Sequence, residues 1–298
     1  MSTDRQQSPL SEANLSKDQN HFPSIIQSGY AYPVRVLSPA QAEDCRRKLE
    51  EYERRLCCNT IHTRCLSGDD RFKIHLLLPW AWNLVHHPTL IQIARSCLQT
   101  EDIWCWSTDV NTKEPGSKSH YTWHQDSTYA GMDPPSAAIT VWLALTESSN
   151  ESGCVKCIPL SHRLGQLPHR EGRGGTDNAL ALQQEIDLTA VGLDPNAAEA
   201  MVLRPGEASV HSFLTVHASE PNSSHDRRIG IAIRYVSAHC TKAGKERETA
   251  SLVSGNGYGL FQQEQEPKVA MGENERRAHR LAMNREKANY LPHGREYT

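Results

Sequence analysis

A histidine and an aspartate two positions apart form the first candidate metal-binding pair in this chain. They are His124 and Asp126, within the segment YTWHQD. In extended backbone, side chains two residues apart project from the same face, with Cα atoms about 7 Å apart. One metal ion can therefore bind both the imidazole and the carboxylate. A third ligand must then come from elsewhere in the chain.

His217 is the best candidate for the third ligand, because the segment Thr215–His217 leaves the strand predicted to begin at Ala208. Two neutral imidazoles and one carboxylate on one triangular face of a metal leave the opposite positions open, as in non-haem iron(II) oxygenases. Zinc enzymes also use two histidines and a carboxylate around an open water position. The three residue types alone leave both metals open.

An alternating strand begins eleven residues after His217. Successive side chains of a strand point to opposite faces, so the strand has one apolar face and one mixed face. The apolar face carries Ile229, Ile231, Ile233 and Tyr235, and the mixed face carries Arg228, Gly230, Ala232 and Arg234.

The mixed face is suited to a cavity, because glycine and alanine leave space beside a guanidinium that can bind a carboxylate through two parallel hydrogen bonds. We predict that Arg228 anchors the distal carboxylate of 2-oxoglutarate, with Ser219 as an additional donor. The alternative is that Arg228 is a surface residue paired with Asp226.

The elements that must bring these residues together are short strands preceded by helices, which predicts a mainly β protein with flanking α-helices. Helices are expected from Ser38 to about Cys58, from about Pro88, and over Glu273–Ala288. Short strands separated by turn residues are expected at Ile103–Val110, Ala138–Thr146, Val155–Leu160, Met201–Leu203, Ala208–Ser212 and Arg228–Val236.

This pattern predicts a disordered polar leader at 1–20 and a single domain at 21–298. Within that domain we expect a helical buttress at 38–100, a β core at about 103–240 and a C-terminal extension at 241–298. The Gly- and Arg-rich segment Gly165–Asn178 is long enough to form a lid or a mobile loop.

Composition excludes several classes of partner. The formal net charge is −3, and no basic run alternates with aromatic residues, so nucleic acid is not expected. The apolar stretch Ile74–Trp82 is far shorter than the ~20 residues that span a bilayer, so no membrane segment is expected. Nine cysteines without framework spacing favour a reducing compartment, and we expect the cytoplasm. Cys154 and Cys157 form a C-x-x-C, but they lie in a predicted strand and have no second pair at zinc-site spacing.

Several long segments, in order, resemble the phytanoyl-CoA dioxygenase family of iron(II)/2-oxoglutarate oxygenases. They are WHQDSTYAGM, VWLALTESSNESGCVKCIPLSHR, GQLPHR, LRPGEASVHS and HASEPNSSHDRRIGIAIRYV, within Lys73 to Tyr235. The resemblance implies a double-stranded β-helix core (jelly-roll, cupin-like), with His124, Asp126 and His217 as iron ligands and Arg228 as the cosubstrate arginine. It also implies that the cosubstrate site is lined by Lys73, Thr108, Trp142 and Ser219.

The resemblance further implies Fe(II), 2-oxoglutarate and O2 as cofactor and cosubstrates, and succinate and CO2 as products. The family's halogenating relatives replace the metal-binding acid with a small residue. Asp126 is retained here, so halogenation is disfavoured. Around Val110–Asn111 this chain has smaller or polar residues where relatives carry aromatic ones, so the pocket wall is expected to differ.

The substrate is expected to be a small molecule, a specialised-metabolite intermediate, that is oxidised. Hydroxylation is the expected outcome, and desaturation, epoxidation and rearrangement stay open. Its pocket is expected to be lined by Trp106, Tyr121, Trp123, Tyr129 and His211, with Gly165–Asn178 as a cover. The sequence permits a homodimer. Two alternatives stay open: a zinc-dependent hydrolase on a jelly-roll scaffold, and a catalytically inactive small-molecule binder.

Overall fold

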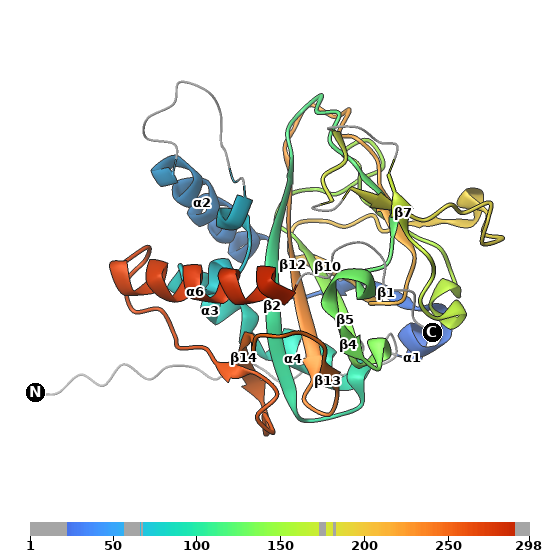
Figure 1. Ribbon diagram of the computed structural model, residues 1–298. Coiled ribbons are helices and arrows are strands. Elements are labelled where there is room, and N and C mark those ends of the chain that lie inside the picture. The colour runs from blue at the N-terminus through green and yellow to red at the C-terminus, as the bar shows by residue number, and fades with distance from the viewer. Residues whose placement is uncertain (1–22, 57–65, 67, 173–176, 181–182, 290–298) are drawn as a thin grey trace, which may run out of the picture.

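Two β-sheets enclose the cavity of interest in the computed structural model, which describes residues 23–56, 66, 68–172, 177–180 and 183–289. The larger sheet has the order β1-β10-β5-β12-β2-β14-β15, and the smaller has the order β3-β11-β6-β9. Side chains from both sheets line one cavity. Figure 1 shows α2, α3 and α6 on one side of β2 and β12. Two sheets that enclose one cavity form the predicted jelly-roll core.

The strands of the larger sheet are β1 (Tyr30–Arg35), β10 (Glu207–Ser212), β5 (Ala138–Ala144), β12 (Arg228–Ser237), β2 (Ile103–Lys113), β14 (Thr249–Ser254) and β15 (Gln262–Gln263). Those of the smaller sheet are β3 (Tyr121–His124), β11 (His217–Ser219), β6 (Val155–Cys157) and β9 (Glu199–Ala200). Two further pairs join β4 (Met132–Asp133) to β13 (Thr241–Lys242), and β7 (Arg170–Glu171) to β8 (Gln184–Glu185).

The helices are α1 (Pro23–Ser28), α2 (Pro39–Leu56), α3 (Pro79–Val85), α4 (Pro88–Leu98), α5 (Ser127–Ala130) and α6 (Glu273–Asn289). At the start of α2, Ser38 Oγ accepts from the Gln41 amide at 3.2 Å and Gln41 Oε1 accepts from the Ser38 amide at 2.8 Å. This reciprocal capping box satisfies two backbone donors that the first helical turn leaves without partners. None of the helices in these described ranges is both long and apolar enough to span a bilayer.

The main hydrophobic core lies between the helices and the larger sheet. Side chains from α2 and α4 pack against the apolar face of β12, which confirms the alternation predicted for that strand. The buried residues that carry this contact include Leu49, Tyr52, Leu90, Ile93, Ile229, Ile231, Ile233 and Tyr235.

The other face of β12 is turned toward the cavity, and Gly230 is needed there for a steric reason. A Cβ atom at Gly230 would lie 2.0 Å from the ring of Trp142 on the neighbouring strand β5. The indole therefore lies directly over the glycine, beside Arg228. The small residue makes room for the wall of the site.

The larger sheet extends beyond the predicted core range of about 103–240, because β1 and β14 both belong to it. β1 contains Pro33, which cannot donate to a ladder, and it pairs only with β10 across a register shift, as expected for an edge strand. β14 reads TASLVS and has little apolar alternation. Neither strand carried the pattern that marks a strand in the sequence.

Several predicted strand boundaries were wrong. β2 ends at Lys113 rather than Val110, β5 at Ala144 rather than Thr146, and β6 at Cys157 rather than Leu160. The strand expected at Met201–Leu203 lies at Glu199–Ala200. Cys154 and Cys157 are both buried free thiols. The predicted leader at 1–20 and the predicted helix end at Cys58 lie outside the described residues.

Candidate metal and cosubstrate site

His124, Asp126 and His217 converge at one point between the sheets. One ligand atom from each lies within 4.8 Å of the others, and all three residues are buried. β3 ends at His124 and β11 begins at His217, and the antiparallel register places these two residues directly opposite each other. Sheet pairing thus joins histidines that are far apart in the sequence.

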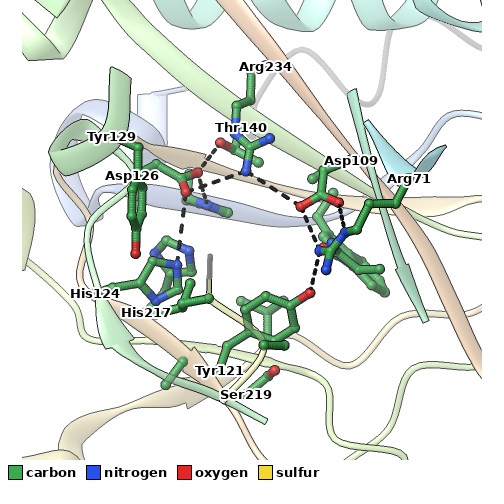
Figure 2. Close-up of a pocket in the computed structure, with 18 of the residues that line it drawn as sticks. Arg71, Asp109, Tyr121, His124, Asp126, Tyr129, Thr140, His217, Ser219 and Arg234 are labelled. Atoms are coloured by element: carbon green, nitrogen blue, oxygen red, sulfur yellow. Dashed lines mark hydrogen bonds and ion pairs between the residues drawn. The ribbon is translucent and has the colours of Figure 1, made fainter. Parts of the chain in front are cut away.

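Asp126 reaches this point by a different route from the predicted one. Its backbone is helical (φ −63°, ψ −28°), and it caps the short helix α5 rather than continuing β3. The expectation of one extended H-x-D strand was therefore wrong. The chain turns after His124, and the turn directs the carboxylate back toward the two imidazoles (Figure 2).

Both histidines present the same nitrogen to the centre. His124 Nδ1 lies 2.7 Å from the Thr122 carbonyl, and His217 Nδ1 lies 2.9 Å from the Thr215 carbonyl. A carbonyl only accepts, so Nδ1 carries the proton and Nε2 keeps a lone pair for a metal. Burial lowers the pKa of both imidazoles, which keeps them neutral.

Asp126 is ionised. Burial alone would raise the pKa of its carboxyl, but the Arg234 guanidinium and the neighbouring His211 hold that pKa well below its usual range. Thr140 Oγ1 also donates to Asp126 Oδ2. Two neutral nitrogens and one carboxylate, each in the protonation state that a divalent metal requires, fit iron(II) and zinc alike.

The triad forms part of the wall of a cavity that is partly open to solvent. Arg228, Ser219 and Trp142 line this cavity, as do Tyr121, Tyr129 and His211. Of the thirteen residues predicted for the site, the structure therefore brings together nine: His124, Asp126, His217, Arg228, Ser219, Trp142, Tyr121, Tyr129 and His211.

Arg228 is fully buried and faces the cavity from the first position of β12. Its Nη1 donates to the Gly153 carbonyl at 2.7 Å, and its guanidinium carbon lies 5.0 Å from the Trp142 ring centroid. Its Nε has no hydrogen-bond partner among the described residues, and no described carboxylate forms an ion pair with it. The alternative partner, Asp226, instead lies 3.4 Å from Arg46.

Burial lowers the pKa of Arg228 to about 10, so the guanidinium stays charged at neutral pH. A buried charge without a counter-ion is costly. A carboxylate from a bound molecule would supply that counter-ion and a partner for Nε.

Four predicted residues lie outside the cavity. Lys73 donates to Glu264 at 3.0 Å and to the Thr249 carbonyl at 2.9 Å, while Thr108 Oγ1 lies 3.1 Å from His75 Nδ1. Both side chains are on the face of the larger sheet that is turned away from the triad. Trp106 and Trp123 belong to other hydrophobic clusters, and Trp106 donates to Glu248 at 2.6 Å.

A network of charged residues was missed in the sequence. Arg71 binds Asp109 through two hydrogen bonds of 2.7 and 2.9 Å and donates to the Tyr121 hydroxyl at 2.8 Å. Arg234 Nη2 lies 3.9 Å from Asp109 and 3.8 Å from Asp126. Figure 2 shows this chain of contacts running from Arg71 to the metal-binding carboxylate.

Strand alternation could have identified part of this network. Asp109, Asn111 and Lys113 recur at every second position of β2, and the last two pair with Gly230 and Arg228 of β12. The prediction chose Thr108, which is on the other face. Arg71 lies in a short 3-10 helix, Gly68–Arg71, that has no such pattern.

The described part of the predicted loop lies against the chain that follows His124. Gln125 Nε2 donates to the Gly165 carbonyl at 2.8 Å, and the Gln125 amide donates to His169 Nε2 at 3.0 Å. Asn178 Nδ2 donates to Thr122 Oγ1 at 3.0 Å. Ala179 and Leu180, just after the loop, line the cavity.

Comparisons with known proteins identify relatives of this chain. The chain is 28% identical over 164 residues to the "Probable alpha-ketoglutarate-dependent hypophosphite dioxygenase" of Stutzerimonas stutzeri, covering 55% of each chain. It is 30% identical over 131 residues to a phytanoyl-CoA dioxygenase domain-containing protein 1 homolog of Caenorhabditis elegans, covering 44% of this chain and 45% of the relative. The chain spans about half the length of these curated relatives.

Among solved structures, the apo form of the non-haem monooxygenase ThoJ matches with a TM-score of 0.77 and 30% identity, covering 89% of this chain and 95% of that chain. The model of the family described as Phytanoyl-CoA dioxygenase (PhyH) matches residues 26–230. The chain therefore belongs to the phytanoyl-CoA dioxygenase family of non-haem iron, 2-oxoglutarate-dependent oxygenases.

Proposed function

We propose that this protein is an iron(II)- and 2-oxoglutarate-dependent oxygenase that hydroxylates a small organic substrate, an intermediate of specialised metabolism. One observation carries the proposal: a triad of two neutral imidazoles and a carboxylate shares a cavity with a buried guanidinium that has no carboxylate partner among the described residues. A metal-chelating diacid requires both features in one cavity.

In this proposal, His124, Asp126 and His217 bind iron, with Nε2 of each histidine and a carboxylate oxygen as donors. When bound, iron and 2-oxoglutarate supply the oxidising chemistry, with O2 as oxidant and succinate and CO2 as by-products. The backbone carbonyls of Thr122 and Thr215 hold the two rings in the required tautomer.

Arg228 and Ser219 bind the distal carboxylate of 2-oxoglutarate. The Trp142 ring packs beside Arg228 and donates from Nε1 to Asn111 at 3.0 Å, which holds the ring in place. A buried guanidinium binds a carboxylate strongly because little water competes for it. Positioning the cosubstrate in this way fixes its other end toward the triad.

Tyr121, Tyr129 and His211, together with Arg71, Asp109 and Arg234, line the remaining wall. This polar wall favours a substrate with hydrogen-bonding groups over a hydrocarbon. The similarity to ThoJ, which is described as a non-haem monooxygenase, supports oxygen insertion. The family resemblance, which includes tailoring enzymes of metabolite pathways, supports the specialised-metabolite assignment. The cytoplasmic location and the homodimer stay predictions.

The test uses anaerobically purified protein loaded with iron(II), to which 2-oxoglutarate, O2 and a metabolite library are added. We expect succinate formation that depends on all three, and a product one oxygen atom heavier than its parent. The same protein loaded with zinc is the control for the hydrolase alternative. Turnover of a substrate by the zinc form without 2-oxoglutarate would overturn the proposal.

A further inference from the structure

A second buried basic side chain lies directly behind Ser219. Lys113 is the last residue of β2 and pairs with Arg228 across the sheet. Its Nζ lies 2.7 Å from Ser219 Oγ and 3.4 Å from the Gly153 carbonyl, and it also contacts the Glu220 carbonyl. Lys113 is 1% exposed and is not itself part of the described cavity wall, so it can act only through Ser219.

Lys113 and Arg228 share the Gly153 carbonyl as acceptor. Neither side chain has a carboxylate within ion-pair distance among the described residues; the nearby Glu220 side chain instead lies 3.5 Å from Lys156. Two buried basic groups therefore face each other across one carbonyl oxygen, and the charge on Arg228 disfavours a charge on Lys113. An anion beside them would favour the charged form of both.

The backbone acceptors around Lys113 are held by close packing. Gly153 has a φ of +71°, and a Cβ atom there would lie 2.1 Å from the Glu220 carbonyl oxygen. Glycine permits both this conformation and this close approach. The carbonyls of Gly153 and Glu220, which both accept from Lys113, thus belong to two segments that pack tightly against each other.

The charge on Lys113 decides whether the Ser219 hydroxyl donates to Lys113 or into the cavity. A neutral amine has two N–H bonds, which the carbonyls of Gly153 and Glu220 occupy, and one lone pair, which accepts the Ser219 hydroxyl proton. An ammonium has three N–H bonds, so the third donates to Ser219 Oγ. The Ser219 hydroxyl is then released to donate into the cavity.

The groups around Lys113 bring its pKa close to neutral pH, so that both forms are accessible. Burial and the Arg228 charge lower its pKa to about 6, with a further lowering from Lys156. Glu220 and Cys154 act in the opposite direction, and the Tyr121 ring centroid lies 5.7 Å from Nζ. At neutral pH the amine is therefore mostly uncharged until an anion arrives.

We propose that Lys113 is a positioning residue for the cosubstrate: binding of the distal carboxylate protonates Lys113 from solvent, which turns the Ser219 hydroxyl into the cavity as a donor. The inference rests on the proposed function, in which Arg228 and Ser219 bind that carboxylate. Binding of one 2-oxoglutarate then takes up close to one proton at about pH 7.5.

The experiment is anaerobic calorimetry of 2-oxoglutarate binding to iron-loaded protein in buffers of different ionisation enthalpy. The slope of the observed enthalpy against that of the buffer counts the protons taken up. We expect close to one for the wild type, close to zero for Lys113→Met, and an unchanged value for Lys156→Met, which removes a neighbouring, partly exposed lysine. Uptake that persists in Lys113→Met would overturn the inference.

A second measurement needs no variant. Because the free enzyme must gain a proton on binding, the wild-type Kd for 2-oxoglutarate is expected to weaken by about tenfold per pH unit above pH 6, until the pKa of the bound form is reached. A Kd that stays constant from pH 6 to 8 would contradict the inference. If the wild type bound no 2-oxoglutarate at any pH, the proposed function itself would fail.

Discussion

Two buried lysines on opposite faces of the larger sheet have opposite surroundings. Lys73 donates to Glu264, and although burial alone would lower its pKa, nearby carboxylates, chiefly Glu264, raise it above its ordinary value. Lys113 has no such carboxylate, and its pKa falls to about 6. Both are among the least exposed large side chains of the described residues.

The difference separates a structural charge from one that awaits a ligand. The Lys73 cluster, defined as Lys73, His75 and Glu264, satisfies its charges internally under α6. The Lys113 cluster, defined as Lys113, Ser219 and Arg228, leaves two basic side chains without an anionic partner among the described residues, beside the metal triad. The lack of an anionic partner for these buried basic groups indicates that a carboxylate ligand binds there.

The largest effect is expected at the triad that adjoins the Lys113 cluster. His217→Ala removes one of three ligands, so iron binding and 2-oxoglutarate-dependent turnover should fall to background. The melting temperature should change little, because the variant removes a buried polar ring from a cavity wall. Iron quantification and succinate assays measure this. Full iron occupancy in the variant would place the metal elsewhere.

Lys73→Met should chiefly lower stability. Removing one partner of a buried ion pair costs about 3–5 kcal/mol, because Glu264 keeps an uncompensated charge. Urea unfolding measures the loss, and the Kd for 2-oxoglutarate of the folded protein should be unchanged. A variant with normal stability and impaired 2-oxoglutarate binding would instead place Lys73 in the cosubstrate site, as the family resemblance implied.

Arg228→Ala should chiefly weaken the binding of 2-oxoglutarate and leave the stability of the fold intact. Loss of a buried, charged hydrogen-bonding partner costs about 2–5 kcal/mol of binding, or about 30- to 4,000-fold in the Kd for 2-oxoglutarate. Stability should hold or rise, since the variant removes a buried charge that has no counter-ion among the described residues. Calorimetry and urea unfolding, run in parallel with Lys73→Met, separate binding from folding. Unchanged affinity would remove Arg228 from the site.

The smallest effect is expected at Glu286, a buried carboxyl on α6 beside the Lys73 cluster. Its Oε2 has no partner among the described residues, and burial, with a further contribution from Glu248, raises its pKa to about 7. The folded state therefore holds this proton more tightly than the unfolded state. The protonated Glu286 carboxyl therefore contributes stability that is complete below pH ~4.5 and is lost as the pH rises through about 7.

Glu286→Gln should remove this pH dependence. We expect the variant to be more stable than the wild type at pH 8, by an amount on the order of 1 kcal/mol, with a smaller difference at pH 5. Thermal unfolding at the two pH values measures the change. An equal difference at both values would show that Glu286 does not titrate in this range.

Regular patterns in the sequence predicted much of the fold and part of the site. The alternation of β12 placed Arg228 on the cavity face, and the capping residue Ser38 predicted the start of α2. The three triad residues were identified by residue type and spacing, although the turn at Asp126 was not. These signals are local or depend on side-chain chemistry alone.

The remaining features depend on pairing between distant segments. Lys73 and Lys113 are both lysines near β2, and only the sheet register shows that Lys113 faces Arg228 while Lys73 meets Glu264, which lies 191 positions further along the chain. Arg71 enters the cavity from a short 3-10 helix without periodicity. The sequence shows the charges, whereas only the structure shows which of them are compensated.

The most direct measurement of the central claim is an anaerobic titration of the wild type with 2-oxoglutarate, with and without iron(II). Stoichiometric binding is expected with iron and much weaker binding without it, and Arg228→Ala should reduce the affinity of the iron form. If affinity were the same with and without iron, or unaffected by Arg228→Ala, the triad and the guanidinium would not share a ligand.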